Sequence, residues 1–273
     1  MQVRKLEEAL GVSLVQQVGR QLYLTEGGQI LAEYAARIFN LVRESEVALA
    51  EVQGLRRGHV TVGASSTPGA YVLPPLIARF RQEHPGIDVE LTLANSHTVL
   101  DRLQRGELDF GVIGEVPLAG SELPLEFDLL VPDDLTVIVP PDHPFALKGS
   151  VGVSSFAEEP LVMRERGSSQ RQVLEARLQE LGLHPRVALE LGSTEAVKHA
   201  VAAGLGAGVL SCFSVAWELA AGRLVAVAMP ELDLHRNLYV VRHRDRRLTR
   251  AATALVEFFR TEAEPCSPLR TGS

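Results

Sequence analysis

The chain has 273 residues, a formal net charge of −7, 46% hydrophobic residues and 22% charged residues. This length fits one large domain or, as we predict, two modest ones, and the apolar fraction excludes a disordered chain. No apolar run reaches the ~18–20 residues of a membrane span. The charged residues Arg4, Lys5, Glu7 and Glu8 stand where a signal peptide has its apolar stretch. We therefore expect a cytoplasmic protein without a membrane partner.

The sequence carries no motif for metal, cofactor or nucleophilic chemistry. Two cysteines, Cys212 and Cys266, are too few for a disulfide framework, and no Cys/His cluster has zinc spacing. The glycine-rich residues 204–208 follow a predicted helix and enter a strand, which is the opposite order to a dinucleotide-binding loop. We expect no catalytic residue, no metal and no cofactor. Cys212 is interpreted as a buried small residue, with a redox sensor as the alternative, and Trp217 as part of the core.

The first 28 residues predict a short helix, a small hairpin and the start of a second helix. Gly11 ends the first helix in the position that a C-cap glycine favours. Two short strands are predicted on either side of Gly19, and Thr25 is the predicted N-cap of the next helix. The charges of residues 1–57 cancel, seven Lys and Arg against seven Asp and Glu, so the remainder of the chain carries the whole −7. The two parts therefore differ in character.

A long helix is predicted after the hairpin. From Leu31 onward, apolar residues recur at alternating spacings of three and four, the repeat with which one helix packs against another. A helix over residues 25–57 would be about 48 Å long at 1.5 Å per residue, so we expect part of it to project and meet a partner. The alternative is a helix that lies on its own domain. The predicted dimerisation residues are Leu31, Tyr34, Ile38, Leu41, Val52 and Leu55.

From Gly58 onward, predicted strands and helices alternate, which indicates an α/β fold. Strands over residues 59–64, 87–93 and 108–113 with helices between them are typical of a parallel sheet. A second set of strands and helices follows over residues 161–210. Two such units, joined by extended crossovers near Val131 and Leu234, predict two lobes around a cleft.

Three N-terminal segments carry a resemblance to a known family. Residues 2–14 (QVRKLEEALGVSL), 18–20 (VGR) and 24–28 (LTEGG) occur in the order and spacing that resemble the second half of the winged helix-turn-helix of LysR-type transcriptional regulators. In that family a recognition helix enters the DNA major groove, a wing follows and a long linker helix dimerises. The family pattern begins earlier than Met1, so we expect either a misplaced start codon or a truncated DNA-binding domain.

The resemblance covers essentially the whole chain and implies its layout. It pairs the strand after Leu234 with the first lobe, and it implies a two-lobed effector domain like that of periplasmic solute-binding proteins. Residues 65–74 and 95–114 also resemble the branch that controls carbon fixation. The implied layout is a partial winged helix-turn-helix (1–28), a linker helix (29–57), lobe I (58–131 and 235–262), lobe II (132–234) and a tail (263–273).

Hydroxyl-rich segments mark the predicted cleft. Ligands of open α/β sheets bind beyond the carboxyl ends of the strands, and the helix N-termini found there attract anions. Plain helix capping is the alternative at each site, but the resemblance favours ligand binding at residues 65–67 and 168–169. It also implies that the backbone of Gly114 approaches a ligand. The predicted effector-binding residues are Ser65, Ser66, Thr67, Ser96, Gly114, Ser168, Ser169 and Ser193.

Two arginines near this cleft have two interpretations. Arg164 and Arg166 offer guanidinium groups to a carboxylate or phosphate, but Glu165 between them makes a local ion pair equally plausible.

The sequence therefore predicts a transcriptional regulator and not an enzyme. Its expected partners are promoter DNA, if the missing N-terminal segment is present, a small anionic metabolite, and further copies of the chain in a homodimer or homotetramer. The alternative is a stand-alone small-molecule-binding module, or a dominant-negative partner without sequence-specific DNA binding. The predicted DNA-contacting residues are Gln2, Arg4, Lys5 and Arg20.

Overall fold

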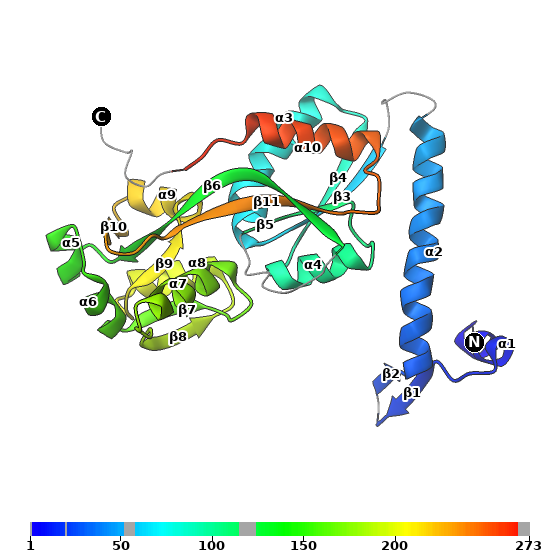
Figure 1. Cartoon of the computed structure of the whole chain (residues 1–273), viewed down its shortest axis with the longest axis horizontal. Helices are drawn as coiled ribbons and strands as arrows, with labels where there is room; N and C mark the ends of the chain where they lie inside the picture. The colour runs from blue at the N-terminus through cyan, green and yellow to red at the C-terminus, as the bar shows by residue number, and fades with distance from the viewer. Residues whose placement is uncertain (1, 20, 52–57, 115–123, 267–273) are drawn as a thin grey trace.

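The computed structural model describes residues 2–19, 21–51, 58–114 and 124–266. An N-terminal helix and hairpin lead into one long helix, and a two-lobed α/β domain follows (Figure 1). No helix among these residues combines the length and the apolar character of a membrane span.

The N-terminal unit has the predicted elements. Gly11 and Gly19 adopt φ angles of 66° and 65°, the left-handed conformation that glycine permits at a helix end and in a tight turn. The Glu7 carboxylate accepts hydrogen bonds from the backbone N–H groups of Leu14 (2.7 Å) and Val15 (3.2 Å), which joins helix to hairpin and lowers the pKa of Glu7. The elements are α1 (Gln2–Leu10), β1 (Val15–Val18) and β2 (Gln21–Leu24).

Helix α2 (Glu26–Glu51) stands apart from both lobes in Figure 1. Thr25 caps it as predicted, because its Oγ1 accepts the backbone N–H of Gly28 at 3.1 Å. Six large apolar side chains along the helix are 48–69% exposed, and Leu31 is partly exposed, so the alternative of a helix lying on its own domain is not what the structure shows for the described residues. These exposed side chains are Ile30, Tyr34, Ile38, Phe39, Leu41 and Val42. Arg20, Val52 and Leu55, named above, lie outside the described residues.

Lobe I is a mixed sheet with helices on both faces. Strands β3, β4 and β5 are parallel, and β11 pairs antiparallel with β5, so the chain returns to this lobe as the resemblance implied. Phe110 and Phe259 meet edge to face at 6.1 Å in the larger of its two cores. The strands are β3 (Gly58–Ala64), β4 (Ile87–Leu93), β5 (Phe110–Gly114) and β11 (His235–His243); α3 (Leu73–Glu83) and α10 (Arg250–Glu262) cover one face and α4 (Ser96–Gln104) the other.

Lobe II has shorter strands: β9 and β10 pair antiparallel with β6, and β7 and β8 form a separate parallel pair. Separate apolar clusters lie on the two faces of its strands. Helices α5 and α6 are five and six residues long, too short to give the helical period on which the sequence prediction relied. The strands are β7 (Leu161–Arg164), β8 (Val187–Leu191), β9 (Gly208–Ser211) and β10 (Val225–Val227); the helices are α5 (Pro144–Lys148), α6 (Val153–Glu158), α7 (Ser169–Glu180), α8 (Thr194–Ala202) and α9 (Cys212–Ala220).

One pair of strands connects the two lobes. Strand β6 (Leu125–Val139) pairs antiparallel with β11 of lobe I, and its far half pairs with β9 and β10 of lobe II (Figure 1). The predicted lobe boundaries fall at residue 131 inside β6 and at the start of β11. Any change in the angle between the lobes must therefore bend or shear this strand pair.

The prediction that Trp217 belongs to the core is wrong. Its side chain is 84% exposed on α9, while Cys212 and Val215 on the same helix are buried. The helix is short and generally apolar, so its sequence did not indicate which face is buried.

Candidate ligand-binding cleft

Two adjoining pockets lie between the lobes, and the predicted effector-binding residues gather around them. The larger has a volume of about 440 Å³ and is lined by Ser66, Tyr71 and Asn95 from lobe I and by Arg164, Glu165, Ser193, Thr194 and Glu195 from lobe II. The smaller has about 10 Å³, the space of one water molecule. Its lining includes Ser65, Ser66, Thr67, Ser96, Ser168, Ser169, Gln170 and Arg236.

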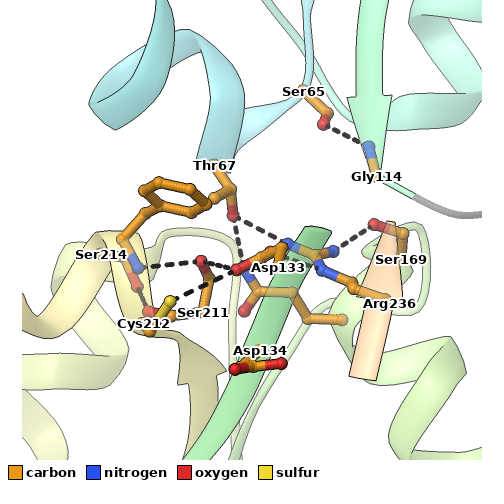
Figure 2. A network of polar contacts seen from close by, with 12 residues as sticks. Ser65, Thr67, Gly114, Asp133, Asp134, Ser169, Ser211, Cys212, Ser214 and Arg236 are labelled. Carbon is orange, nitrogen blue, oxygen red and sulfur yellow. Dashed lines mark hydrogen bonds and ion pairs between the residues drawn. The ribbon is translucent and has the colours of Figure 1, made fainter. Parts of the chain in front are cut away.

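A buried ion pair lies beside the smaller pocket (Figure 2). Arg236 donates to Asp133 Oδ2 from Nε at 2.8 Å and from Nη2 at 2.7 Å. The two residues face each other on the connecting strands β11 and β6, and their side chains are 1% and 0% exposed. The same guanidinium donates to Ser169 of lobe II at 2.7 Å and to Thr67 of lobe I at 3.1 Å. One side chain therefore contacts both lobes and the connection between them.

The second carboxylate oxygen of Asp133 is also bound. It accepts from Ser211 Oγ at 2.5 Å and contacts Cys212 Sγ at 3.9 Å. Cys212 Sγ also donates to the carbonyl of Cys266 at 2.9 Å. The interaction with Cys266, together with burial, raises the pKa of the Cys212 thiol. A thiol held protonated is a poor nucleophile, which favours the interpretation of Cys212 as a buried packing residue.

Gly114 is close to the same guanidinium. A Cβ at this position would lie 2.5 Å from Ser169 Oγ and 2.6 Å from Arg236 Nη1. The space that glycine leaves is therefore occupied by Ser169 and Arg236 in this structure. The N–H of Gly114 donates to Ser65 Oγ at 3.2 Å, which ties together the ends of β5 and β3.

The helix starts around the cleft differ in how their hydroxyls are used. Asn95 caps α4, because Asn95 Oδ1 accepts the N–H of Thr98 at 2.9 Å, and Ser96 is the first residue of that helix. Ser193 caps α8 with a long contact of 3.5 Å, whereas Ser168 makes no side-chain cap bond at the start of α7.

Two buried polar atoms in the smaller pocket have no hydrogen-bond partner among the described residues: Ser96 Oγ and Gln170 Oε1. An unpaired buried polar group costs about 1–3 kcal/mol. Such groups call for an explanation, and a ligand that completes them is one.

A second contact between the lobes closes one edge of the larger pocket. Tyr71, in the π-helical turn η1 (Pro68–Val72), donates to Glu195 Oε1 at 2.5 Å. Lys198 pairs with Glu195 at 2.7 Å and with Glu218 at 2.8 Å. Burial and the bond to Glu195 raise the pKa of Tyr71. Burial alone would raise the pKa of Glu195, but the hydrogen bonds from Lys198 and Tyr71 hold it below its usual value.

Arg164 forms the local ion pair that was one of its two interpretations. It donates to both carboxylate oxygens of Glu165, at 2.8 and 2.9 Å. It also donates to Thr194 at 2.6 Å and to Ser66 at 3.1 Å. Arg166 is exposed and lines neither pocket.

Sequence reasoning missed Tyr71, Asp133, Lys198 and Arg236. No motif marks them, and they meet only through the pairing of β6 with β11 and the approach of the lobes.

Of the predicted DNA-contacting residues, Arg4 and Lys5 are exposed on α1 and Gln2 begins that helix. Within the described part of the chain, no group of three or more His, Cys, Asp or Glu side chains is arranged to hold a metal ion.

Comparison with known proteins identifies the family. Residues 53–264 match the model described as the LysR substrate binding domain. The chain belongs to the LysR family. The RuBisCO operon transcriptional regulator of Allochromatium vinosum is 36% identical over 96% of this chain and 86% of its own length. The transcriptional activator CmpR of Synechocystis sp. is 32% identical over 97% of this chain and 86% of its own length. These relatives are regulators and not enzymes, and they agree with the resemblance to the carbon-fixation branch.

Solved structures of LysR regulators share the fold. The regulatory domain of Synechocystis CcmR in complex with 2-PG has a TM-score of 0.71 and 29% identity, and it covers 77% of this chain and 100% of its own. A full-length OxyR variant of Pseudomonas aeruginosa has a TM-score of 0.70 over 94% of this chain and 83% of its own. At 24% identity the OxyR comparison shows the fold alone.

Replacing Asp133 by Asn should strongly destabilise this LysR-family chain. The substitution keeps the shape of the side chain but leaves Arg236 without its buried counter-charge, at a cost of about 3–5 kcal/mol. The control is Asp134→Asn, at the next residue. Asp134 pairs with His235 at the surface, where the pair contributes about 0–1 kcal/mol. Urea denaturation measures both, and equal losses would contradict a special role for the buried pair.

Proposed function

We propose that this chain is an effector-controlled LysR-type regulator whose cleft binds a small anionic metabolite. Binding changes the closure of the two lobes, and the linker helices transmit the change to a dimeric or tetrameric DNA-bound assembly. The observation that carries the proposal is the pair of unpartnered buried atoms, Ser96 Oγ and Gln170 Oε1, in a pocket whose walls come from both lobes. The 2-PG complex of the CcmR domain, 29% identical to this chain, supports a small metabolite as the ligand.

The chemistry of the cleft favours an anion. The first residues of α4, α7 and α8 line the pockets, and a helix N-terminus carries free N–H groups and a positive partial charge. Serine and threonine hydroxyls add short donors, and Arg164 and Arg236 add guanidinium N–H donors. The carboxylates near the pockets, Asp133, Glu165 and Glu195, are each already paired with a cation.

A ligand in this position would act on both lobes at once. It shifts the equilibrium between two lobe arrangements only by its difference in affinity for them, typically about 1–3 kcal/mol. Because β6 extends from lobe I into lobe II and β11 of lobe I pairs with it, that difference in affinity would appear as a change in this strand pair.

The proposed assembly depends on α2. Its exposed apolar side chains, which include Ile38 and Leu41, would be buried against the same helix of a second copy. By the resemblance to the family, Arg4 and Lys5 of α1 would lie near DNA phosphates.

Ser96→Ala should separate ligand binding from structural effects. Without ligand, the variant should melt at the wild-type temperature or higher, because the change removes a buried hydroxyl that has no partner. With a phosphorylated or carboxylated metabolite, 2-PG among them, the affinity should fall about 5- to 10-fold because one hydrogen bond is lost. Thermal shift and calorimetry measure the two effects. Ser155→Ala, at an exposed serine of α6, is the control. Unchanged affinity in both Ser96→Ala and Ser168→Ala would remove the proposed site.

A double variant, Ile38→Glu with Leu41→Glu, should convert the protein from a dimer or larger assembly into a monomer. Charges on this stripe cannot be buried in a helix–helix seam. Sedimentation velocity at micromolar concentration gives the result. Leu147→Glu changes a side chain of lobe II that is 82% exposed, and it should leave the assembly intact. A wild-type protein that sediments as a monomer would refute the proposed role of α2.

A further inference from the structure

Two buried arginines serve the cleft, but their counter-charges differ. Asp133, which holds Arg236, is fully buried and is also bound by Ser211. Glu165, which holds Arg164, keeps 27% of its side chain exposed and lines the larger pocket. Asp133 therefore has no route to water without unfolding its surroundings, whereas Glu165 reaches solvent by a change of its own side-chain conformation.

The Arg164–Glu165 pair has the geometry of an arginine bound to a ligand anion. Nε and Nη2 each donate to a different oxygen of the Glu165 carboxylate, at 2.8 and 2.9 Å. This two-pronged arrangement is the one in which guanidinium recognises free carboxylates and phosphates. The Glu165 carboxylate thus occupies the place that a ligand anion would take on Arg164.

Arg164 would keep its position without Glu165. Its Nη1 donates to Thr194 of lobe II at 2.6 Å and its Nη2 to Ser66 of lobe I at 3.1 Å. These bonds hold the guanidinium between the lobes, with its Nε and Nη2 facing the position of the Glu165 carboxylate.

Glu195 is the other carboxylate that lines the larger pocket, and it is bound differently. It accepts from Tyr71 and pairs with Lys198, neither of which depends on Arg164. Arrival of an anion at Arg164 would leave these bonds in place. Glu165 would lose its cation and would face a like charge, which drives it toward water.

We propose that Glu165 is an internal competitor of the effector. In the ligand-free protein its carboxylate fills the guanidinium fork of Arg164, and the carboxylate or phosphate group of the effector replaces it there. The inference rests on the proposed anion-binding function and narrows it. The ligand is a compact organic acid or phosphate monoester that fits about 440 Å³, and a neutral molecule is rejected because it cannot release Arg164 from Glu165.

Glu165→Gln tests the proposal because it removes the competing charge and leaves a side chain of the same shape. We expect the variant to bind inorganic phosphate, oxalate and 2-PG about 10-fold or more tightly than the wild type, as measured by calorimetry. The matched control is Glu175→Gln, which removes the same charge from another buried arginine. Arg171 keeps its bond to Glu190 in that variant, and Glu175 lines neither pocket. The control should bind these anions with wild-type affinity.

A stability measurement guards against a merely structural effect. Without anion, Glu165→Gln should melt at a lower temperature than the wild type, because Arg164 loses its charged partner. Saturating phosphate should raise the melting temperature of the variant to that of the wild type. Replacing Arg164 by Lys in the Glu165→Gln protein should abolish the gain in affinity, since lysine lacks the fork.

The outcomes separate the two proposals. Wild-type binding with unchanged or weaker binding by Glu165→Gln overturns the role of Glu165 and leaves the anion site standing. Absence of binding by both proteins, for every anion tried, overturns the anion site and the competitor together.

Discussion

The two-lobed domain depends on one buried ion pair, Arg236 with Asp133. Removing both charges from water costs several kcal/mol per ion, and the pair is stable only because the acceptors and donors around it are satisfied. Asp133 accepts from Arg236 and Ser211, and the guanidinium donates onward to Thr67 and Ser169. The pair therefore sets the register of the connecting strands, the distance between the lobes and the shape of the smaller pocket at once. A ligand that separates Thr67 from Ser169 must offer replacement bonds to the same guanidinium.

This arrangement explains how ligand binding in the cleft would change the position of one lobe relative to the other and so affect the rest of the chain. Lobe I begins at β3, which follows the linker helix in sequence, and lobe II is connected to lobe I through β6 and β11. The lobes also meet at Tyr71–Glu195 and at Ser66–Arg164, around the larger pocket. Movement between them is thus restricted at the strands and adjustable at the side-chain contacts, which is the behaviour of a hinge. The angle between the lobes is therefore set in part by the polar contacts of Tyr71 and Ser66, which can exchange hydrogen-bond partners at low cost.

Local patterns in the sequence predicted the repetitive part of this fold. Alternating apolar residues predicted a strand over residues 87–93, the observed bounds of β4, and Thr25 was found as a helix cap. The first half of β6 was missed because it contains Glu126, Asp128, Pro132 and Asp133, residues that are depleted in strands. Arg236 and Asp133 are 103 residues apart and meet through strand register, which no local pattern encodes. For Arg164 the sequence left two interpretations, because Glu165 stands beside it as a possible partner in place of a ligand anion. The pair forms because Arg164 is the last residue of β7 and Glu165 lies beyond it.

The charge balance of the cleft has a consequence for selectivity. The cations that line the two pockets are already neutralised, Arg236 by Asp133 and Arg164 by Glu165. Lys198, which pairs with Glu195 at the edge of the larger pocket, is neutralised by Glu195 and Glu218. A cleft whose cations are paired attracts anions weakly at long range. Recognition must therefore come at short range, when a ligand anion replaces the carboxylate that is bound to a cleft arginine. The pairs differ in how easily they exchange, from the fully buried Asp133 to the partly exposed Glu165. An anion that replaces Glu165 on Arg164 and also makes hydrogen bonds to Ser96 and Gln170 gains binding free energy from both sets of contacts. An ion that reaches only Arg164 gains little over the carboxylate it displaces. Discrimination between metabolites and abundant simple anions then follows from the distance between the fork of Arg164 and the unpaired groups of the smaller pocket.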